Sequence, residues 1–170
     1  MRRFGIAAVL VAAVLTLGGA TLASGHNGDG ADDGHSGQTF TIYAPTAQDR
    51  IAFLPVVTGK FSLGNRVVFS DDLFTAKGGK SLGIDGGVCT VVRITDAANG
   101  SGVLECTITF DLPDGQIATQ ELHTLTNGNL TGTQPGAITG GTGKYRDAKG
   151  QVSVEFLSTT EANVTFFLDD

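Results

Sequence analysis

Apolar and polar residues alternate along short stretches of this chain, and helical spacing of apolar residues is missing from residue 39 onward. The stretch 103–112 shows the pattern most clearly. Its alternate positions Leu104, Cys106, Ile108 and Phe110 are apolar, whereas Glu105, Thr107, Thr109 and Asp111 lie between them. A period of two is typical of a β-strand with one buried face, so we expect an all-β domain.

Turn-forming residues divide the chain into roughly eight strands, each rich in Val, Ile, Thr or Phe. The candidates are residues 39–43, 51–57, 66–74, 87–95, 103–112, 116–124, 137–139 with their flanks, 151–158 and 163–168. Asp114-Gly115 is a strong tight-turn dipeptide and predicts an antiparallel hairpin over 103–124. A second hairpin is expected to turn near Glu161 and Asn163.

The strand pattern alone allows two architectures. Sequential antiparallel strands joined by short turns form either a sandwich or an up-and-down barrel. Closure into a barrel removes the exposed sheet edges that apolar strands would otherwise present.

The N-terminal residues predict processing and export. Arg2 and Arg3 precede an uncharged run that ends at Leu17 and is followed by small residues, as in a signal peptide over residues 1–24. Residues 25–38 are rich in Gly, Asp and His, have almost no apolar side chains and predict a disordered linker. The remaining residues, 39–170, are long enough for one domain. We therefore expect a secreted, extracellular protein without a membrane segment after cleavage.

Composition excludes several partners and cofactors. The net charge is -6 and the basic residues are scattered, so we expect no nucleic acid. Gly143-Lys144 lacks the Ser or Thr of a phosphate-binding loop, and no helical pattern follows the glycines, so we expect no cofactor. His26 and His35 lie among aspartates whose spacing does not match a calcium loop, and we expect no metal.

The two cysteines can be interpreted in two ways. A four-residue loop over 96–99 would place Cys89 directly opposite Cys106, within the range of a disulfide bond. An oxidising compartment favours this pairing. With another register, both cysteines would be free and buried.

Few residues suggest catalysis. No Gly-x-Ser-x-Gly motif occurs, and His123 is the one histidine after residue 38, near a strand end where solvent exposure is expected. Asp71 and Asp72 are adjacent, so on a strand they point to opposite faces, and at most one faces the interior.

The order and spacing of the glycine-rich segments resemble those of allene oxide cyclases and the related dirigent proteins. The segments are GNRVVFSDDLFTAKGGKSLGIDGGVCTVVRI, then LPDGQIATQ, then AITGGTGKYRDAKGQVSVEF, within residues 59–156. The resemblance implies an eight-stranded antiparallel barrel with an apolar lumen, often assembled as a homotrimer. It also implies that a small lipophilic or polyunsaturated ligand is held in one folded shape, as an intramolecular isomerase or cyclase would require.

The chain departs from the family pattern at a residue that the cyclases use for catalysis. Cyclases use a glutamate on the first strand, and TFTIYAPTAQDR contains none. The catalytic residues are therefore unknown at this stage, and it stays open whether the protein is an enzyme. Cys89 matches the pocket cysteine of the cyclases; the full set of expected pocket residues is Tyr43, Asp72, Cys89 and Phe110.

Three functions remain open from the sequence, and export argues against the third, a pericyclase-like enzyme that folds a linear precursor for cycloaddition. In the first, the lumen binds a lipophilic molecule, with or without a cyclisation step. In the second, the protein is a non-catalytic structural or surface module whose phenylalanines fill the barrel. These phenylalanines are Phe40, Phe53, Phe69, Phe110, Phe156 and Phe166.

Overall fold

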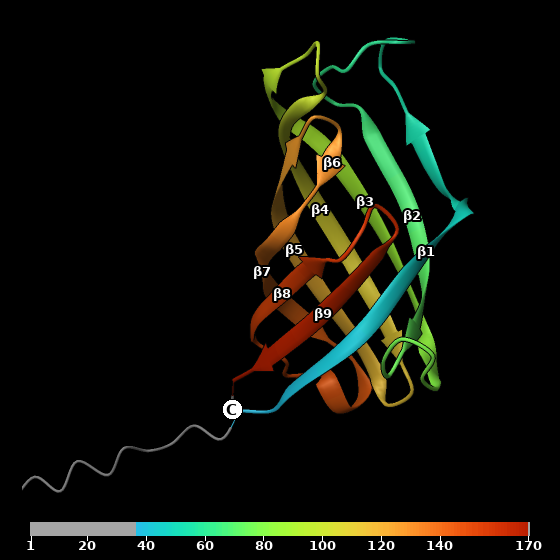
Figure 1. The fold of residues 1–170 in the computed structure, drawn as a ribbon. Helices are drawn as coiled ribbons and strands as arrows, with labels where there is room; N and C mark the ends of the chain where they lie inside the picture. Colours follow the sequence, from blue (N-terminus) through green and yellow to red (C-terminus); the bar gives the residue numbers. More distant parts are fainter. Residues whose placement is uncertain (1–36, 170) are drawn as a thin grey trace, which may run out of the picture. The chain divides into compact units, whose positions relative to one another are not determined.

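The computed structural model describes residues 37–169 and shows a closed antiparallel β-barrel (Figure 1). The strands are β1 Thr39–Leu54, β2 Arg66–Phe74, β3 Ser81–Asp96, β4 Ser101–Leu112, β5 Gly115–Thr126, β6 Asn129–Leu130, β7 Gly132–Gly141, β8 Gly150–Phe156 and β9 Glu161–Leu168. A 3₁₀ turn, η1 Gly143–Tyr145, precedes β8. The predicted signal peptide and nearly all of the predicted linker lie outside the described residues.

Eight strands form the wall of the barrel. Each strand pairs with the next along the chain, β5 pairs with β7, and β9 returns to pair with β1. The two-residue β6 adds only to the end of β5. All pairings are antiparallel, so the up-and-down barrel is confirmed over the sandwich.

The expected strands are largely confirmed, with three corrections. Residues 39–43 and 51–57 were expected as separate strands, but β1 is continuous to Leu54, with an irregularity in which residues 47–50 face only Ser70. β3 begins at Ser81 because Gly83 and the following residues extend the pairing with β2 and β4. The last hairpin turns at residues 157–160 instead of near Asn163.

The register between β3 and β4 places Cys89 directly opposite Cys106, as expected. The loop differs from the expected one, because Asp96 pairs with Ser101 and leaves residues 97–100 unpaired. The strand register shifts twice between the loop and the cysteines, once between Asp96 and Ile94 and once between Arg93 and Val91. These shifts restore the pairing in which Cys89 lies opposite Cys106. The cysteines form a disulfide with a Cα–Cα distance of 4.0 Å.

An aromatic cluster fills one end of the lumen. Phe166 stacks on Phe40 at a centroid distance of 4.9 Å and meets Phe110 edge-on at 5.0 Å. The ring centroid of Tyr145, on η1, lies 6.2 Å from that of Phe40. These side chains come from the first residues of β1, the end of β4, the last residues of β9 and the turn before β8, and these segments gather at the lower end of the barrel in Figure 1.

Among residues 37–169, no helix is long and apolar enough to cross a membrane.

Candidate functional site

Beyond the aromatic cluster, the lumen holds a cavity of about 380 Å³. Its walls are mainly apolar, with contributions from every wall strand except β7. Ile51 and Phe53 line it and yet are 44% and 54% exposed, so the cavity opens to solvent beside the second half of β1. Its size falls within the range of about 300–1,000 Å³ that is usual for small-molecule sites.

Five ionisable residues line this apolar space, and four of them are buried; the fifth, Glu161 of β9, is only partly buried. Asp71 lies on β2, Asp85 on β3, and Glu121 and His123 on β5, and all four are buried. Each occupies an inward position of its strand, where the period-two pattern would otherwise place an apolar residue. Buried ionisable groups in an apolar cavity are costly to folding and characteristic of functional sites.

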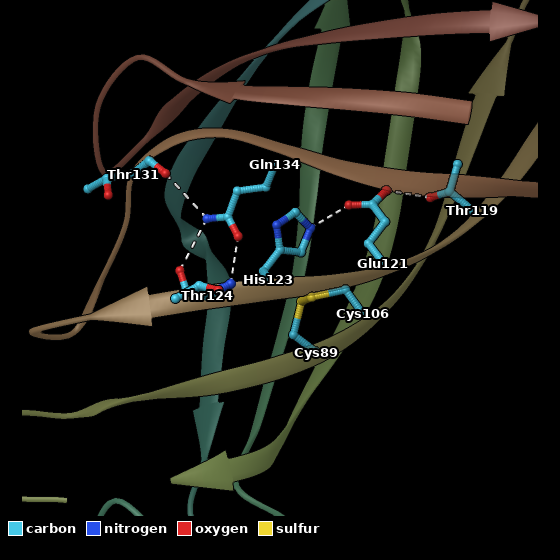
Figure 2. A network of polar contacts seen from close by, with 8 residues as sticks. All are labelled: Cys89, Cys106, Thr119, Glu121, His123, Thr124, Thr131 and Gln134. Atoms are coloured by element: carbon cyan, nitrogen blue, oxygen red, sulfur yellow. Dashed lines mark hydrogen bonds and ion pairs between the residues drawn. A yellow bond between two sulfur atoms is a disulfide. The ribbon is translucent and has the colours of Figure 1, made fainter. Parts of the chain in front are cut away.

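Glu121 and His123 form a contact pair on β5, both only 2% exposed (Figure 2). His123 Nε2 bonds to one carboxylate oxygen of Glu121, and Thr119 Oγ1 donates to the other at 2.7 Å. The edge of the His123 ring also packs on Phe156, with centroids 5.4 Å apart. The carboxylate therefore fixes the imidazole in one orientation.

The neighbouring strand makes room for this pair. Glu121 is the last residue of β5 that pairs with β7, and its partner is Gly136. A Cβ on Gly136 would lie 2.2 Å from Glu121 Cγ, so only glycine leaves space for the inward glutamate. Beyond Glu121, where the β5–β7 ladder ends, the side chain of Gln134 connects the two strands. Its Nε2 donates to the carbonyl oxygens of Thr124 at 3.1 Å and Thr131 at 3.3 Å (Figure 2).

Asp71 and Asp85 form a second polar group across the β2–β3 pair. The Asp71 amide donates to Asp85 Oδ1 at 2.7 Å. Burial, with a smaller contribution from the nearby Asp71 charge, raises the pKa of Asp85 to about 8. Burial also raises the pKa of Asp71. At neutral pH Asp85 is therefore predominantly a neutral acid, which can donate a proton or a hydrogen bond.

Two buried side-chain atoms in the described part of the chain have no hydrogen-bond partner in the protein. They are Asp71 Oδ1 and His123 Nδ1. Both residues line the cavity. Because an unpaired buried polar atom is unfavourable, these two atoms are suited to bind a polar group of a ligand or an ordered water.

The expected pocket residues fall into two groups. Cys89 and Phe110 line the cavity, whereas Tyr43 and Asp72 do not. Tyr43 bonds to Glu161, which itself lines the cavity, and the outward Asp72 pairs with Arg50 at 2.6 Å. Of the two adjacent aspartates, it is Asp71 that faces inward, in phase with Phe69.

Sequence reasoning missed Asp85 and Glu121, and expected His123 to be solvent-exposed. A signal for them was present. Thr119, Glu121 and His123 alternate in phase with Ile117 and Leu125, which marks them as inward positions of an otherwise apolar face. Asp85 has the same phase as Cys89 on β3.

Phe69 depends on a glycine for its place on the cavity wall, and this supplies a test. A Cβ on Gly87 would lie 2.4 Å from Phe69 Cζ, so Gly87→Ala is expected to push the ring into the cavity. Ligand affinity should fall by about tenfold, or ~1.4 kcal/mol. The matched control is Gly86→Ala, since a Cβ there meets nothing within 4 Å. Titration of both variants with one ligand checks the prediction, and equal affinities would contradict it.

The structure defines a class by its fold, a closed eight-stranded barrel with polar side chains inside an apolar lumen, and comparison with known proteins identifies the family. The family described as "Allene oxide cyclase barrel like domain" matches residues 40–167. The chain therefore belongs to the allene oxide cyclase barrel like family, as its glycine-rich segments indicated.

Solved structures of similar fold have several named activities. A pyocyanin demethylase is 28% identical, with a TM-score of 0.65, and the match covers 77% of this chain and 99% of that one. A pterocarpan synthase dirigent protein is 18% identical, with a TM-score of 0.58 and coverage of 78% and 92%. The Diels-Alderase AbmU from Streptomyces koyangensis is 13% identical, with a TM-score of 0.61 and coverage of 82% and 72%. The last two similarities show a shared fold.

Proposed function

We propose that this protein binds a small, flat, largely apolar ring compound in its lumen and acts on it by proton transfer. The observation that carries the proposal is the pair of unpartnered buried atoms, Asp71 Oδ1 and His123 Nδ1, in the wall of an otherwise apolar cavity. Apolar walls enclose the rings, and the polar atoms orient them.

The candidate reaction groups have different roles. Glu121 and His123 can hold and relay a proton, because they are in direct contact and shielded from water. Asp85 can supply a proton as a neutral acid. Proton donors and acceptors of this kind act on the heteroatoms of a ligand, because these atoms can take up or release a proton. The three side chains therefore favour a nitrogen-containing ring over a plain hydrocarbon chain as the ligand.

The similarity to a pyocyanin demethylase supports the phenazine class as the ligand. Pyocyanin is a planar N-methylated phenazine that carries ring nitrogens and an oxygen, so it offers polar groups on an apolar frame. The ligand class proposed here is therefore a phenazine or a ring compound of similar shape and polarity.

A cyclase that works by conformational steering is the second candidate. It is favoured by the enclosed, mainly apolar walls, which could hold a linear polyunsaturated chain in a folded shape. The first strand, Thr39–Leu54, contains no glutamate that could assist such a reaction. The buried acids and histidine have no evident role in this alternative.

A structural module with a solid core is disfavoured by the cavity. Phe40, Phe110 and Phe166 do fill one end of the lumen. Phe53, Phe69 and Phe156 instead line the open part.

Export and assembly belong to the same proposal. The disulfide supports an oxidising compartment, in agreement with the signal peptide predicted over residues 1–24. A homotrimer, which the family resemblance implies, stays a prediction.

Ligand titration tests the function. Pyocyanin is expected to bind saturably, followed by its absorbance, and more tightly than linoleic acid, the probe for the cyclase alternative. His123→Gln and Glu121→Gln should weaken pyocyanin binding about tenfold or more, because each disturbs the polar wall. Glu105→Gln on the outward face of β4 is the matched control and should bind as the unchanged protein does.

Product analysis by mass spectrometry then separates binding from catalysis. Demethylation balances with water as co-reactant: the methyl carbon leaves as formaldehyde and the ring is reduced by two electrons. Release of formaldehyde that depends on Glu121, with a ring product lighter than pyocyanin by CH₂ after reoxidation in air, would show demethylation. Tighter binding of linoleic acid than of pyocyanin would overturn the proposed ligand class, and binding of neither probe would overturn lumen binding of both classes.

A further inference from the structure

The Cys89–Cys106 disulfide lies in the wall of the cavity. Both cysteines occupy inward positions and line the lumen, although their exposed fractions are only 5% and 0%. Of the two, only Cys89 keeps an exposed fraction that a molecule in the cavity could contact, and a protein reductant is too large to enter.

The disulfide joins two strands that are already joined. Cys89 and Cys106 are direct partners in the β3–β4 ladder, which extends along the whole hairpin in both directions. The bond closes a loop of sequence separation 17 within this hairpin and does not tie distant parts of the barrel together. The strand pairing alone therefore gives no reason for a covalent bond at this point, whereas its position in the cavity wall would allow it to react with a bound molecule.

A proton-carrying pair stands beside the sulfur atoms. Cys106 faces Glu121 across the β4–β5 ladder, and Leu104 faces His123 in the same ladder. Side chains at directly opposed positions on one face have Cβ atoms about 4.5–5.5 Å apart. Figure 2 shows the disulfide next to the Glu121–His123 pair, so protons released or consumed at sulfur have an acceptor and donor close by.

We propose that this disulfide is a redox group of the lumen, which exchanges two electrons and two protons with the ring compound bound there. The proposal rests on the proposed function, because it needs a ring compound in the cavity. Phenazines and quinones are the chemical classes that carry two electrons and two protons on a flat conjugated frame.

The exchange balances without a further reactant. In the dithiol form, one thiolate adds to an electron-poor ring atom, and the second thiolate attacks the first sulfur. The S–S bond forms, the bond between sulfur and ring breaks with its electron pair on the ring, and two protons complete the dihydro compound. The cysteines are oxidised and the ring is reduced; the reverse reaction oxidises a dihydro ring and opens the disulfide. Glu121 and His123 carry the protons between sulfur and ring.

Anaerobic mixing tests the proposal on the intact protein. The disulfide is reduced with a small phosphine, the phosphine is removed by gel filtration, and the dithiol protein is mixed with oxidised pyocyanin. One equivalent of pyocyanin should be bleached per chain, and the protein should lose two hydrogens by mass. The rate should saturate with pyocyanin concentration and exceed that of equimolar free dithiothreitol by at least about tenfold, because the reactants are held together.

Two proteins serve as controls. The untreated disulfide protein should bind oxidised pyocyanin without bleaching it. The double variant Cys89→Ser, Cys106→Ser should not bleach pyocyanin after the same phosphine treatment, because it has no thiol to oxidise. The dithiol form of the unchanged chain needs no substitution, so the test does not depend on the folding of the variant.

The outcomes separate the two proposals. Saturable bleaching with re-formation of the disulfide supports the redox group. Binding of pyocyanin without bleaching, or a folded protein whose disulfide resists the phosphine, overturns the redox group and leaves the proposed function standing. Absence of pyocyanin binding in all forms overturns both for this ligand class.

Discussion

Asp85→Asn is expected to raise the free energy of unfolding at pH 9 by several kcal/mol, in the range of about 3–6. The carboxyl is buried, and its folded pKa is raised from 3.8 to about 8. A folded pKa above the unfolded one means that the folded state holds the proton more tightly. The stability contributed by Asp85 is therefore fully present below pH 4 and is lost as the pH rises through 8.

The asparagine variant removes this dependence and keeps the hydrogen bond, because its amide oxygen can still accept from the Asp71 N–H group. Its advantage over the unchanged protein should be small at pH 4 and largest above pH 8. Urea unfolding at pH 5 and pH 9 measures the difference. Asp114→Asn, an exposed substitution, should show no such change with pH. A pH-independent effect at Asp85 would contradict the burial of an acid with this pKa.

Phe166→Ala is expected to lower the free energy of unfolding by about 3–5 kcal/mol. Phe166 is fully buried and joins Phe40 and Phe110 in the cluster that closes one end of the lumen. Removing its ring leaves a void that two other aromatic rings cannot fill without leaving their own contacts. The loss combines buried apolar area with lost packing.

Its sequence neighbour provides the control for this substitution. Phe167 points outward from the same strand and is 37% exposed, so Phe167→Ala should cost about 1 kcal/mol or less. Chemical denaturation of the two variants under identical conditions gives the comparison. Equal losses would show that the aromatic cluster does not stabilise the barrel more than an outer side chain does.

The division of the lumen is the structural feature that bears most on the functions that the sequence left open. The aromatic cluster occupies one end, and the cavity with its acids and histidine occupies the other. A phenylalanine count cannot distinguish these arrangements, because a ring that fills a barrel and a ring that lines a cavity have the same inward phase. Phe69 shows the difference: its ring rests on the wall only because Gly87 has no side chain.

Local patterns in the sequence determined the strands and most of the turns, and they allowed a Cys89–Cys106 disulfide without deciding for it. The alternation from Leu104 to Phe110 and the Asp114-Gly115 turn act over a few residues, and such short-range preferences can be recognised without the fold. The order of the glycine-rich segments also indicated the barrel family. The signal peptide over residues 1–24 is predicted from the same kind of local composition and stays a prediction.

Only the tertiary structure decided which polar residues share the interior. Asp71, Asp85, Glu121 and His123 lie on three strands, and their meeting depends on how the closed barrel sets the strands against one another. The irregularity in β1 and the shifts between β3 and β4 change register by whole residues, and a shift of one residue would turn a strand's inward side chains outward. Long-range closure therefore determines the site, while short-range patterning determines the elements that carry it.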